Sequence, residues 1–552
     1  MKKRRLEWVF IIVMITLAYL VFFTDIPSLP KLISMALYWG MISITVLSLM
    51  LENRTAQNTL LWIYILVFLP VLGYIIYVYS GQLFFKGYLF KSKRIKDREV
   101  FEAMSRNQEK LDLSWLNYHQ NHFVHYLDWA TNTPMNAKTK TRMLKNGGET
   151  FREIKRALQE AEDFIHLEYY IFRDDRLGNE IIDILIDRVE AGVEVRLMYD
   201  AIGSLTLSGT AIRRMKEAGI KVQPFLPLKN GLINQKFNFR NHRKIIVIDG
   251  RTGFVGGLNI GVEYLGEDER FGFWCDTHVL LEGEAVQTLH AVFLLDWRYV
   301  SGEMLVTDER YMKTGLLAGR GPAAQVAETA ASLDHAAARD PGNGSGLEQV
   351  GASGPGSGAG PDQVAASDPD TGTGLVHVVA TGPETERMSD HYYAMISCAT
   401  KSIWIASPYF VPNQAIRTAL RIAANKGIQI RIMVPDTNDG FLTQYASRSY
   451  LPELLRAGIE IYAYQKGFLH KKVMIIDGDL ATIGTANMDM RSFRLNFEVN
   501  LFLIGTDSIQ DLVTHYQEDL EDCLRIRPVE FYKRGFSEKV KESFARLFSG
   551  VL

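Results

Sequence analysis

The chain has 552 residues, which is enough for more than one folded domain. Its formal net charge of −2 gives no reason to expect nucleic acid or another bulk polyanion as a partner. Its three cysteines, Cys275, Cys398 and Cys523, are too few and too scattered for a disulfide framework or a cysteine-based zinc site.

Three apolar runs near the N-terminus predict membrane helices. They cover Trp8–Phe23, Leu32–Leu51 and Leu60–Tyr79, and none contains Asp, Glu, Lys or Arg. The second and third runs match the roughly 20 residues that cross a bilayer. The first run is shorter and follows a basic start, as in a signal peptide, but no small-residue cleavage site follows it. We therefore expect residues 1–82 to form a membrane anchor with two or three transmembrane helices.

Basic residues at the two ends of this anchor make conflicting predictions of orientation. The initial MKKRR favours a cytoplasmic N-terminus, and the lysines and arginine between Lys86 and Lys96 favour a cytoplasmic location for the chain after the third run. Three complete spans cannot satisfy both clusters. We give the later cluster more weight and expect the soluble part of the chain on the cytoplasmic side.

The globular part of the sequence contains an internal repeat. The helix and strand patterns FREIKRALQEAEDF, IHLEYYIF, GNEIIDILIDRVEAG and VEVRLMYD are followed, 228 to 239 residues later, by DHYYAMISCAT, SIWIASPYF, NQAIRTALRIAANKG and IQIRIMVPD. Alternating helices and strands of this kind are typical of an α/β fold. We expect two copies of one α/β domain, at residues 149–314 and 383–552.

Two segments are expected to lie outside the repeats. Residues 97–148 are polar with interspersed aromatics, and we interpret residues 83–148 as a linker. Residues 315–382 are rich in Gly, Ala, Pro, Ser and Asp, and no aromatic residue occurs between Tyr311 and Tyr392. Such a composition buries too little apolar surface to fold, so we expect a disordered insertion without a role in the chemistry.

Each repeat contains the same short motif. It consists of His-x-Lys, four apolar residues, Asp, six further residues, two small residues, any residue and Asn. Each apolar run ends at Asp-Gly, which indicates a tight turn between two strands. The motif positions are His242, Lys244, Asp249, Gly256, Gly257 and Asn259 in the first copy, and His470, Lys472, Asp477, Gly484, Thr485 and Asn487 in the second.

The spacing within the motif indicates chemistry on one face of a strand. Because alternate side chains of a strand point the same way, the histidine and the lysine share a face. An imidazole can attack or protonate, and an ammonium group can hold an anionic oxygen. Asp249 and Asp477 have the opposite parity and lie at the turn, so we expect them to brace the motif. The duplication favours a functional over a purely structural role.

The paired motifs resemble the HxK(x)4D(x)6G[GT]xN signature of the phospholipase D superfamily. The phrases around them, FNFRNHRKIIVIDG and GTANMDMRSFRLNFEVN among others, are similar to bacterial cardiolipin synthases. The resemblance runs from about Trp62 to the C-terminus and lapses within residues 315–382. It implies two phospholipase D-type α/β repeats packed around one active site, in a multi-pass protein of the bacterial cell membrane.

The resemblance also implies a mechanism. One imidazole attacks the phosphorus of a phosphodiester and forms a phosphohistidine, while the other protonates the departing alkoxide and later deprotonates the incoming alcohol. By resemblance, His242 is the nucleophile and His470 the general acid and base. Lys244, Lys472, Asn259 and Asn487 would hold the non-bridging oxygens, with no metal ion and no cofactor.

Two acids are candidates for orienting the histidines. Asp276 lies 34 residues after His242, and Glu498 lies 28 residues after His470. Both occupy positions where the family carries the carboxylate that fixes the tautomer of a catalytic histidine. Each lies in an apolar, strand-like stretch, which favours this role over that of a surface acid.

The expected reaction joins two phosphatidylglycerol molecules into cardiolipin and releases glycerol, with membrane lipids as the partners. Alternatives are a phospholipase D-type hydrolase and a phosphatidyltransferase that uses another alcohol. A nuclease is disfavoured by the apolar runs and by the lack of a basic patch with aromatics. A non-catalytic membrane scaffold is disfavoured by the intact motifs. The sequence also lacks the Asp-Gly-x-x-Ala-Arg pattern of metal-dependent CDP-alcohol phosphotransferases, and it predicts no oligomeric state.

Overall fold

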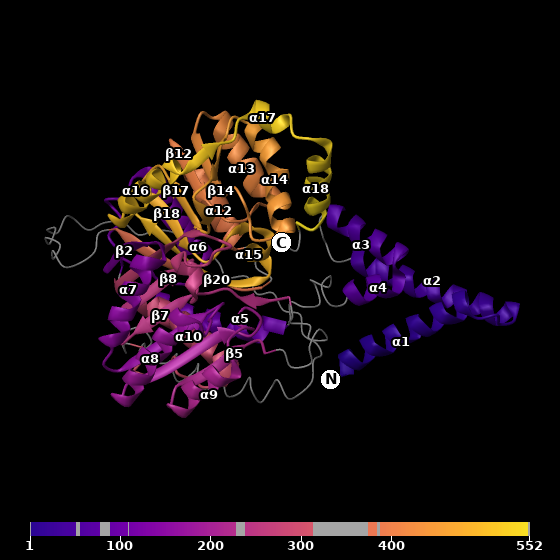
Figure 1. Cartoon of the computed structure of the whole chain (residues 1–552), viewed down its shortest axis with the longest axis horizontal. Coiled ribbons are helices and arrows are strands. Elements are labelled where there is room, and N and C mark those ends of the chain that lie inside the picture. The colour runs from indigo at the N-terminus through magenta and orange to yellow at the C-terminus, as the bar shows by residue number, and fades with distance from the viewer. Residues whose placement is uncertain are drawn as a thin grey trace, which may run out of the picture.

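Two β-sheets with their flanking helices form the body of the molecule, and the N-terminal helices project from it as an arm (Figure 1). The computed structural model describes residues 2–50, 56–77, 89–108, 110–227, 238–312, 374–383 and 387–549. Most of the predicted insertion at residues 315–382 lies outside the described residues.

The two sheets have the same topology, as the sequence repeat predicts. The first sheet has the order β2-β10-β8-β7-β3-β4-β5, and the second contains the matching series β11-β20-β18-β17-β12-β14-β15. In both, the last three strands run parallel and the others are antiparallel to their neighbours. The α/β fold with two similar repeats is therefore confirmed.

The strands of the first sheet are β2 (Thr139–Lys145), β3 (Phe164–Tyr169), β4 (Glu194–Asp200), β5 (Lys221–Phe225), β7 (Ile245–Ile248), β8 (Thr252–Gly256) and β10 (Thr277–Gly283). Those of the second are β1 (Met135–Asn136), β11 (Leu375–Thr381), β12 (Ser402–Ala406), β14 (Gln429–Pro435), β15 (Glu460–Tyr464), β17 (Val473–Ile476), β18 (Leu480–Gly484), β20 (Asn496–Ile504) and β21 (Cys523–Arg525). The short strands β6 (Arg240–Asn241), β9 (Phe273–Cys275), β13 (Phe410–Val411), β16 (Gly467–Leu469) and β19 (Met488–Asp489) lie near the junction of the repeats.

Helices cover the outer faces of the sheets, and one apolar core joins the inner faces. The helix α10 (Glu284–Ser301) is buried all round from Ala285 to Trp297, as expected of a helix inside a core shared by both sheets. The other helices of the body are α5 (Lys91–Arg106), α6 (Tyr118–Ala130), α7 (Asn146–Gln159), α8 (Arg176–Glu190), α9 (Gly209–Glu217), the 3-10 helix η4 (Val262–Leu265), α12 (Arg387–Cys398), α13 (Gln414–Asn425), α14 (Phe441–Arg456), α15 (Met490–Arg494), α16 (Ser508–Glu521), α17 (Pro528–Tyr532) and α18 (Phe536–Leu547).

Each motif forms the predicted strand, turn and returning strand. In β7 and β8, Ile245 lies opposite Val255, and in β17 and β18, Val473 lies opposite Ile483. Asp249 and Asp477 have φ angles of 52° and 54°, and the glycine after each also has a positive φ. Two consecutive residues with positive φ are what the tightest hairpin turns require, and Asp-Gly supplies them at low cost.

Two of the predicted boundaries are wrong. Residues 83–148 are not only a linker, because they contain α5 and α6, β2 pairs with β10 in the first sheet, and β1 pairs with β11 in the second. The predicted insertion extends too far, because β11 at Leu375–Thr381 is a nearly fully buried strand of the second sheet. Its Leu-Val-His-Val-Val sequence is β-prone, but the low-complexity composition before it concealed the start of the repeat.

The N-terminal arm consists of α1 (Lys2–Phe23), α2 (Ser28–Met50), α3 (Ala56–Phe68) and α4 (Pro70–Ile76). Among the described residues, α2 is the one helix long and apolar enough to cross a membrane, and Val9–Phe23 and Thr59–Phe68 are apolar but shorter. The third predicted run is not one helix, because Pro70 has no backbone N–H and the helix restarts there.

Candidate active site

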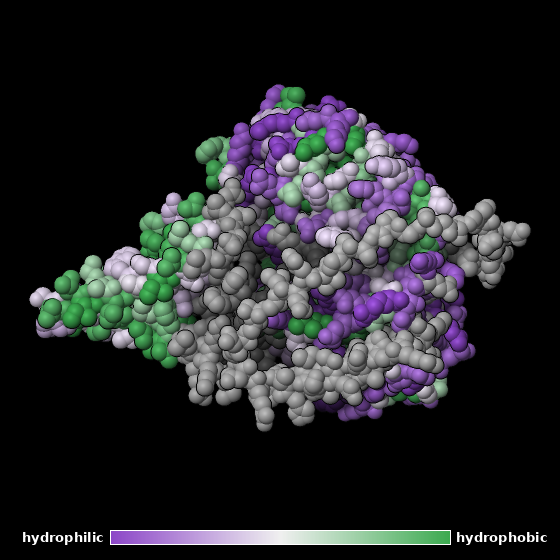
Figure 2. Space-filling view, turned by 180° about the vertical axis from the view of Figure 1, so that it is seen from behind, coloured by the Kyte–Doolittle hydropathy of each residue, from purple (hydrophilic) through white to green (hydrophobic). Residues whose placement is uncertain are grey.

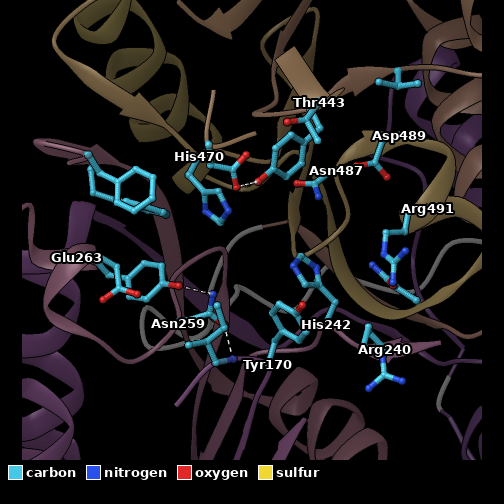
Figure 3. A pocket seen from close by; sticks show the side chains of 18 of the residues that line it. Tyr170, Arg240, His242, Asn259, Glu263, Thr443, His470, Asn487, Asp489 and Arg491 are labelled. Atoms are coloured by element: carbon cyan, nitrogen blue, oxygen red, sulfur yellow. Dashed lines mark hydrogen bonds between the residues drawn. The ribbon is translucent and has the colours of Figure 1, made fainter. Parts of the chain in front are cut away.

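The two motif histidines meet in one cavity between the repeats. The cavity has a volume of about 430 Å³ and is lined by residues of both halves of the chain. Figure 3 shows His242 and His470 entering it from opposite sides, with the asparagines of both motifs beside them. The structure thus brings together residues that are 228 positions apart in sequence.

Short parallel strand pairs between the repeats hold each histidine in place. β6, which leads into His242, pairs with β20 of the second repeat, and the His242 N–H donates to the Phe497 carbonyl at 2.9 Å. β16, which leads into His470, pairs with β9 of the first repeat, and the His470 N–H donates to the Cys275 carbonyl at 2.7 Å. His242 is thus bonded to the residue before Glu498, and His470 to the residue before Asp276. Each histidine therefore lies next to an acid of the other repeat.

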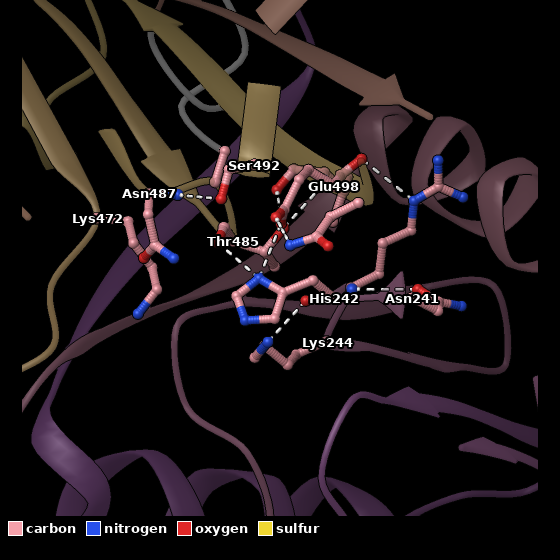
Figure 4. A network of polar contacts seen from close by, with 12 residues as sticks. Asn241, His242, Lys244, Lys472, Thr485, Asn487, Ser492 and Glu498 are labelled. Carbon is pink, nitrogen blue, oxygen red and sulfur yellow. Dashed lines mark hydrogen bonds and ion pairs between the residues drawn. The ribbon is translucent and has the colours of Figure 1, made fainter. Parts of the chain in front are cut away.

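The two candidate acids contact the histidines across the repeats. Glu498 Oε2 lies 3.0 Å from His242 Nδ1 (Figure 4), and Asp276 Oδ2 lies 2.6 Å from His470 Nδ1. Along the chain each acid follows the histidine of its own repeat, but in space it serves the other one. Because Nδ1 of each ring contacts a buried carboxylate, we expect Nε2 to be the nitrogen that does the chemistry. Nε2 of His470 also lies 3.1 Å from Nζ of Lys472.

The small residues of the motif make room for these carboxylates. A Cβ atom at Gly257 would lie 2.1 Å from Oδ1 of Asp276, so no other residue fits without displacing the acid. The second copy carries Thr485 at this position, and its hydroxyl donates to Glu498 Oε2 at 2.5 Å. The Gly-or-Thr alternative in the motif thus reflects two ways of placing an orienting carboxylate.

The two motif lysines are buried beside the histidines, and neither Lys244 nor Lys472 belongs to the residues that line the cavity. Lys244 Nζ donates to the His242 carbonyl at 2.6 Å, and Lys472 Nζ donates to the His470 carbonyl at 2.5 Å. Burial lowers the pKa of Lys244 to about 7 and that of Lys472 to about 8, despite the nearby Glu498 and Asp276. A bound anionic phosphodiester would favour the charged forms of both lysines.

Burial also sets the charge of the histidines. It lowers the pKa of His470 to about 3, with a further contribution from Lys472, and it lowers the pKa of His242. For Asp276 and Glu498, burial alone would raise the pKa, but the interactions and hydrogen bonds with the neighbouring lysine and histidine outweigh burial and the pKa of each acid is lowered. The site therefore combines two ionised acids with two neutral imidazoles near neutral pH, and a neutral imidazole is the form that attacks phosphorus.

The motif asparagines differ in their contacts. Asn259 accepts the Ile171 N–H at 3.0 Å through Oδ1 and donates to the Tyr264 hydroxyl at 3.0 Å. Asn487 lies in the cavity, and its side-chain Oδ1 is buried without a hydrogen-bond partner among the residues that the structure describes. Asn487 thus has more capacity left for a ligand, whereas Asn259 also ties the first motif to the end of β3.

Asp249 and Asp477 lie at the turns and point away from the cavity. Asp249 accepts backbone N–H groups of Glu162, Asp163 and Phe164 at 2.8 to 2.9 Å. Asp477 likewise accepts the N–H groups of Thr400, Lys401 and Ser402, all at 2.7 Å. Each carboxylate therefore anchors the hairpin of its motif to the start of the neighbouring strand.

We expect Asp249→Ala to lower the free energy of unfolding by about 2–4 kcal/mol, because three backbone donors lose a charged acceptor and Ala strains the positive φ. Asp249→Asn keeps one acceptor oxygen and tolerates this φ, so its loss should be clearly smaller. Urea unfolding measures both variants. An Asp249→Ala protein of normal stability without activity would instead assign this acid a direct part in the chemistry.

We expect Lys244→Met to raise the melting temperature at pH 7, by about 2 °C or more, while activity is lost. The pKa of Lys244 is lower in the folded than in the unfolded chain, so the charged form costs stability below about pH 7. Between about pH 7 and pH 10 the folded chain has lost this proton and the unfolded chain still binds it. The destabilisation by Lys244 therefore decreases as the pH rises and is gone near pH 10. Thermal melts at pH 7 and pH 10 should therefore show the difference between variant and wild type shrinking. A difference in melting temperature that is the same at both pH values would mean that the effect does not arise from the charge of Lys244.

The sequence prediction missed several residues of the cavity wall. Arg240 lies two positions before His242, and Arg491 lies four positions after Asn487; both line the cavity and add positive charge. The strand spacing of Arg240 could have revealed it, because it shares the parity of His242. Aromatic rings also contact the histidines: Tyr170 lies 5.0 Å from His242 and Trp274 lies 4.9 Å from His470, measured between ring centroids.

Two repeats that each place a His-x-Lys strand in a shared cavity define an enzyme of the phospholipase D superfamily. The family model described as "Cardiolipin synthase, PLD-like domain" matches residues 154–297 and 392–522. The chain is 50% identical over 552 residues to the "Probable cardiolipin synthase YwiE" of Bacillus subtilis (strain 168). This match covers 100% of this chain and 100% of the relative. The chain belongs to the cardiolipin synthases, the phosphatidyltransferases of this superfamily.

Further similar proteins agree with this assignment. "Cardiolipin synthase 2" of Bacillus cereus is 42% identical over 503 residues, covering 91% of this chain and 88% of the relative. Among solved structures, a phosphatidylserine synthase of Haemophilus influenzae Rd KW20 superposes with a TM-score of 0.53, at 15% identity, over 79% of this chain and 100% of that one. At this identity the structural match supports the fold alone.

Proposed function

We propose that this enzyme transfers the phosphatidyl group of one phosphatidylglycerol to a second, giving cardiolipin and glycerol. The observation that carries the proposal is the pair of imidazoles facing one cavity, each held at Nδ1 by a buried carboxylate of the other repeat. This arrangement supplies one nucleophile and one proton carrier on opposite sides of a phosphorus atom.

In the first step, His242 Nε2 attacks the phosphorus, and the bond to the glycerol oxygen breaks. His470, protonated at Nε2, gives its proton to the departing oxygen, so that glycerol leaves neutral. Because His470 is neutral in the empty site, it must take up this proton when the substrate binds, and Asp276 and the charge of the bound phosphodiester favour that uptake. The phosphatidyl group is then attached to His242 through a phosphorus–nitrogen bond.

In the second step, the primary hydroxyl of another phosphatidylglycerol loses its proton to His470 Nε2. Its oxygen attacks the phosphorus, the phosphorus–nitrogen bond breaks, and His242 regains its lone pair. Asn487, Arg240 and Arg491 line the cavity and would hold the non-bridging oxygens through both steps. The buried Lys244 and Lys472 would add positive charge beside the histidines. We assign no metal ion or cofactor to either step.

We also propose that the N-terminal arm anchors the enzyme as a multi-pass protein of the bacterial cell membrane, with two or three transmembrane helices and the repeats on the cytoplasmic side. The support is the apolar α2 and the apolar segments of α1 and α3, together with the basic residues that begin α5. An anchor of this kind keeps the cavity close to its lipid substrates.

The function is tested with purified enzyme in vesicles that contain phosphatidylglycerol, with a chelator and without CDP-diacylglycerol. We expect cardiolipin and glycerol in equal amounts, because two copies of one substrate supply both the phosphatidyl group and the alcohol. His242→Ala enzyme in the same vesicles is the control. Phosphatidic acid as the main product would identify a hydrolase, and an absolute requirement for divalent metal would contradict the mechanism.

A further inference from the structure

The C-terminal helix α18 turns its apolar face away from the protein. Phe536, Val540, Phe544 and Leu547 are exposed to 83%, 49%, 52% and 55%. Their spacing places all four on one side of the helix. The face that packs against the body instead carries Glu542 and Ala545, which are buried. This is the reverse of the usual arrangement in a soluble protein, where the apolar stripe covers the core.

The orientation of α18 is fixed by specific contacts. Glu542 forms a bidentate ion pair with Arg534, in which Nε donates to Oε1 at 2.9 Å and Nη2 donates to Oε2 at 2.7 Å. Its Oε1 also lies 3.5 Å from Nε of Arg448 on α14. Ala545 belongs to a small buried cluster with Tyr450 of α14 and Val411 of β13. Rolling the helix to hide its apolar stripe would break this buried ion pair and this packing.

Basic side chains border the apolar stripe on both edges. By helical position, Lys539 and Arg546 lie along one edge and Lys541 along the other. Lys541 pairs with Glu538 at 2.7 Å, and the Arg546 guanidinium lies 4.7 Å from the centre of the Tyr450 ring. An apolar stripe with cations at its borders is the pattern of helices that lie in the plane of a membrane and bind anionic headgroups.

The position of α18 agrees with such a role. Figure 1 shows it on the side of the body from which the N-terminal helices project, and Figure 2 shows those helices as a hydrophobic arm on a largely hydrophilic body. The helix is also coupled to the active site. Val411, which packs in the same cluster as Ala545, lines the catalytic cavity, and so does Thr443 near the start of α14.

We propose that α18 is an in-plane membrane helix, whose stripe of Phe536, Val540, Phe544 and Leu547 inserts into the headgroup region of an anionic phospholipid bilayer. Through α14 and the cluster at Val411, this contact holds the cavity mouth at the level of the lipid headgroups. The chain then meets the bilayer at two separate places, the N-terminal arm and α18. This goes beyond the proposed reaction and does not depend on which alcohol is used.

The proposal is tested by labelling the stripe in the full-length protein. A fluorophore is attached at Phe544→Cys in a chain with Cys523→Ser, because Cys275 and Cys398 are buried. The matched control is Ile422→Cys on α13, exposed to 49% against 52% for Phe544, in the last turn before β14 and hence at the sheet edge opposite the cavity. Both proteins are reconstituted in vesicles of phosphatidylglycerol and phosphatidylcholine, with quencher-bearing lipids.

We expect the label at position 544 to be quenched by the lipid-borne quencher and shielded from a water-soluble one, with the opposite result at position 422. Equal access of the aqueous quencher to both labels would overturn the proposal. So would shielding at position 544 that grows with protein density and ignores the lipid quencher, since that result would identify a second copy of the chain as the occupant. These readouts measure insertion, so they stand whether or not the proposed reaction is correct.

Turnover gives a second readout. We expect Val540→Gln, Phe544→Gln and Leu547→Gln together to lower the rate on vesicles about tenfold, because three apolar contacts with lipid are lost. The rate on the same lipid in detergent micelles should stay at the wild-type level, as should both rates of the Ile422→Gln control. An equal loss in vesicles and micelles would show that the stripe stabilises the fold and does not contact the membrane.

Discussion

Replacing His242 with Ala is expected to lower turnover by about 10⁴-fold or more, and to abolish the covalent enzyme intermediate. His470→Ala is expected to be as inactive on phosphatidylglycerol, but for a different reason, since it retains the nucleophile and lacks the proton donor. The two variants separate on phosphatidyl-p-nitrophenol, whose leaving group needs no proton. His470→Ala should then release one equivalent of nitrophenolate and remain covalently modified, and His242→Ala should release none.

The control for this experiment is His515→Ala, at a half-buried histidine outside the cavity, which should turn over like the wild type. Mass spectrometry of the trapped protein locates the modified residue. A phosphatidyl group on His470 in the wild-type enzyme would reverse the roles assigned to the two histidines. The close similarity of the two motifs makes this the decisive observation for the direction of attack.

Removing the charge of one orienting acid is expected to lower turnover by about 10²–10⁴-fold, because the histidine loses both its tautomer and the stabilisation of its charged form. The crossed contacts predict which step fails. Glu498→Gln should impair His242, so that no intermediate forms even on the nitrophenyl lipid. Asp276→Asn should impair His470, so that the nitrophenolate burst survives and the intermediate accumulates. Burst kinetics on these two isosteric variants measure both outcomes.

The reverse pattern, with a burst in Glu498→Gln and none in Asp276→Asn, would mean that each acid acts on the histidine of its own repeat. Equal loss of the burst in both variants would mean that the acids hold the cavity together and do not serve separate steps. Thr485→Val is an informative companion variant, because it removes the hydroxyl that donates to Glu498 and leaves the carboxylate. It should show a weaker form of the Glu498→Gln defect.

The sequence predicted the repeated parts of the fold well, because periodicity and turn chemistry are local. The Asp-Gly turns after β7 and β17 follow from residue types alone, as does the shared face of His242 and Lys244. The boundaries failed where local signals compete. β11 follows a long low-complexity stretch, and the two-residue β1 reaches the second sheet although β2, three residues later, belongs to the first. No local pattern encodes which sheet a short strand joins.

The residues of the candidate site were likewise accessible where the signal is local in sequence. The ten expected residues come from motif spacing and family resemblance, and their roles stay predictions. The structure brings the motif histidines and asparagines to one cavity, with the lysines and the acids Asp276 and Glu498 buried beside the histidines. The pairing of acids with histidines was not accessible, because it depends on the strand pairs β6–β20 and β9–β16 between the repeats. Chain order suggested neighbours within a repeat, whereas the backbone bonds of His242 and His470 to the other repeat dictate the crossing.

The crossed pairing makes the two halves of the chain dependent on one another in a specific way. An isolated half would contain one histidine without its carboxylate partner and one carboxylate without its histidine. Such a half would therefore be inactive, and not merely slower. Two identical halves, related by a twofold axis, would restore both pairs at once. The arrangement is therefore one that a symmetric dimer of a half-length ancestor could already have used. Fusion of the two copies would then have allowed each half to specialise, one for attack and one for proton transfer.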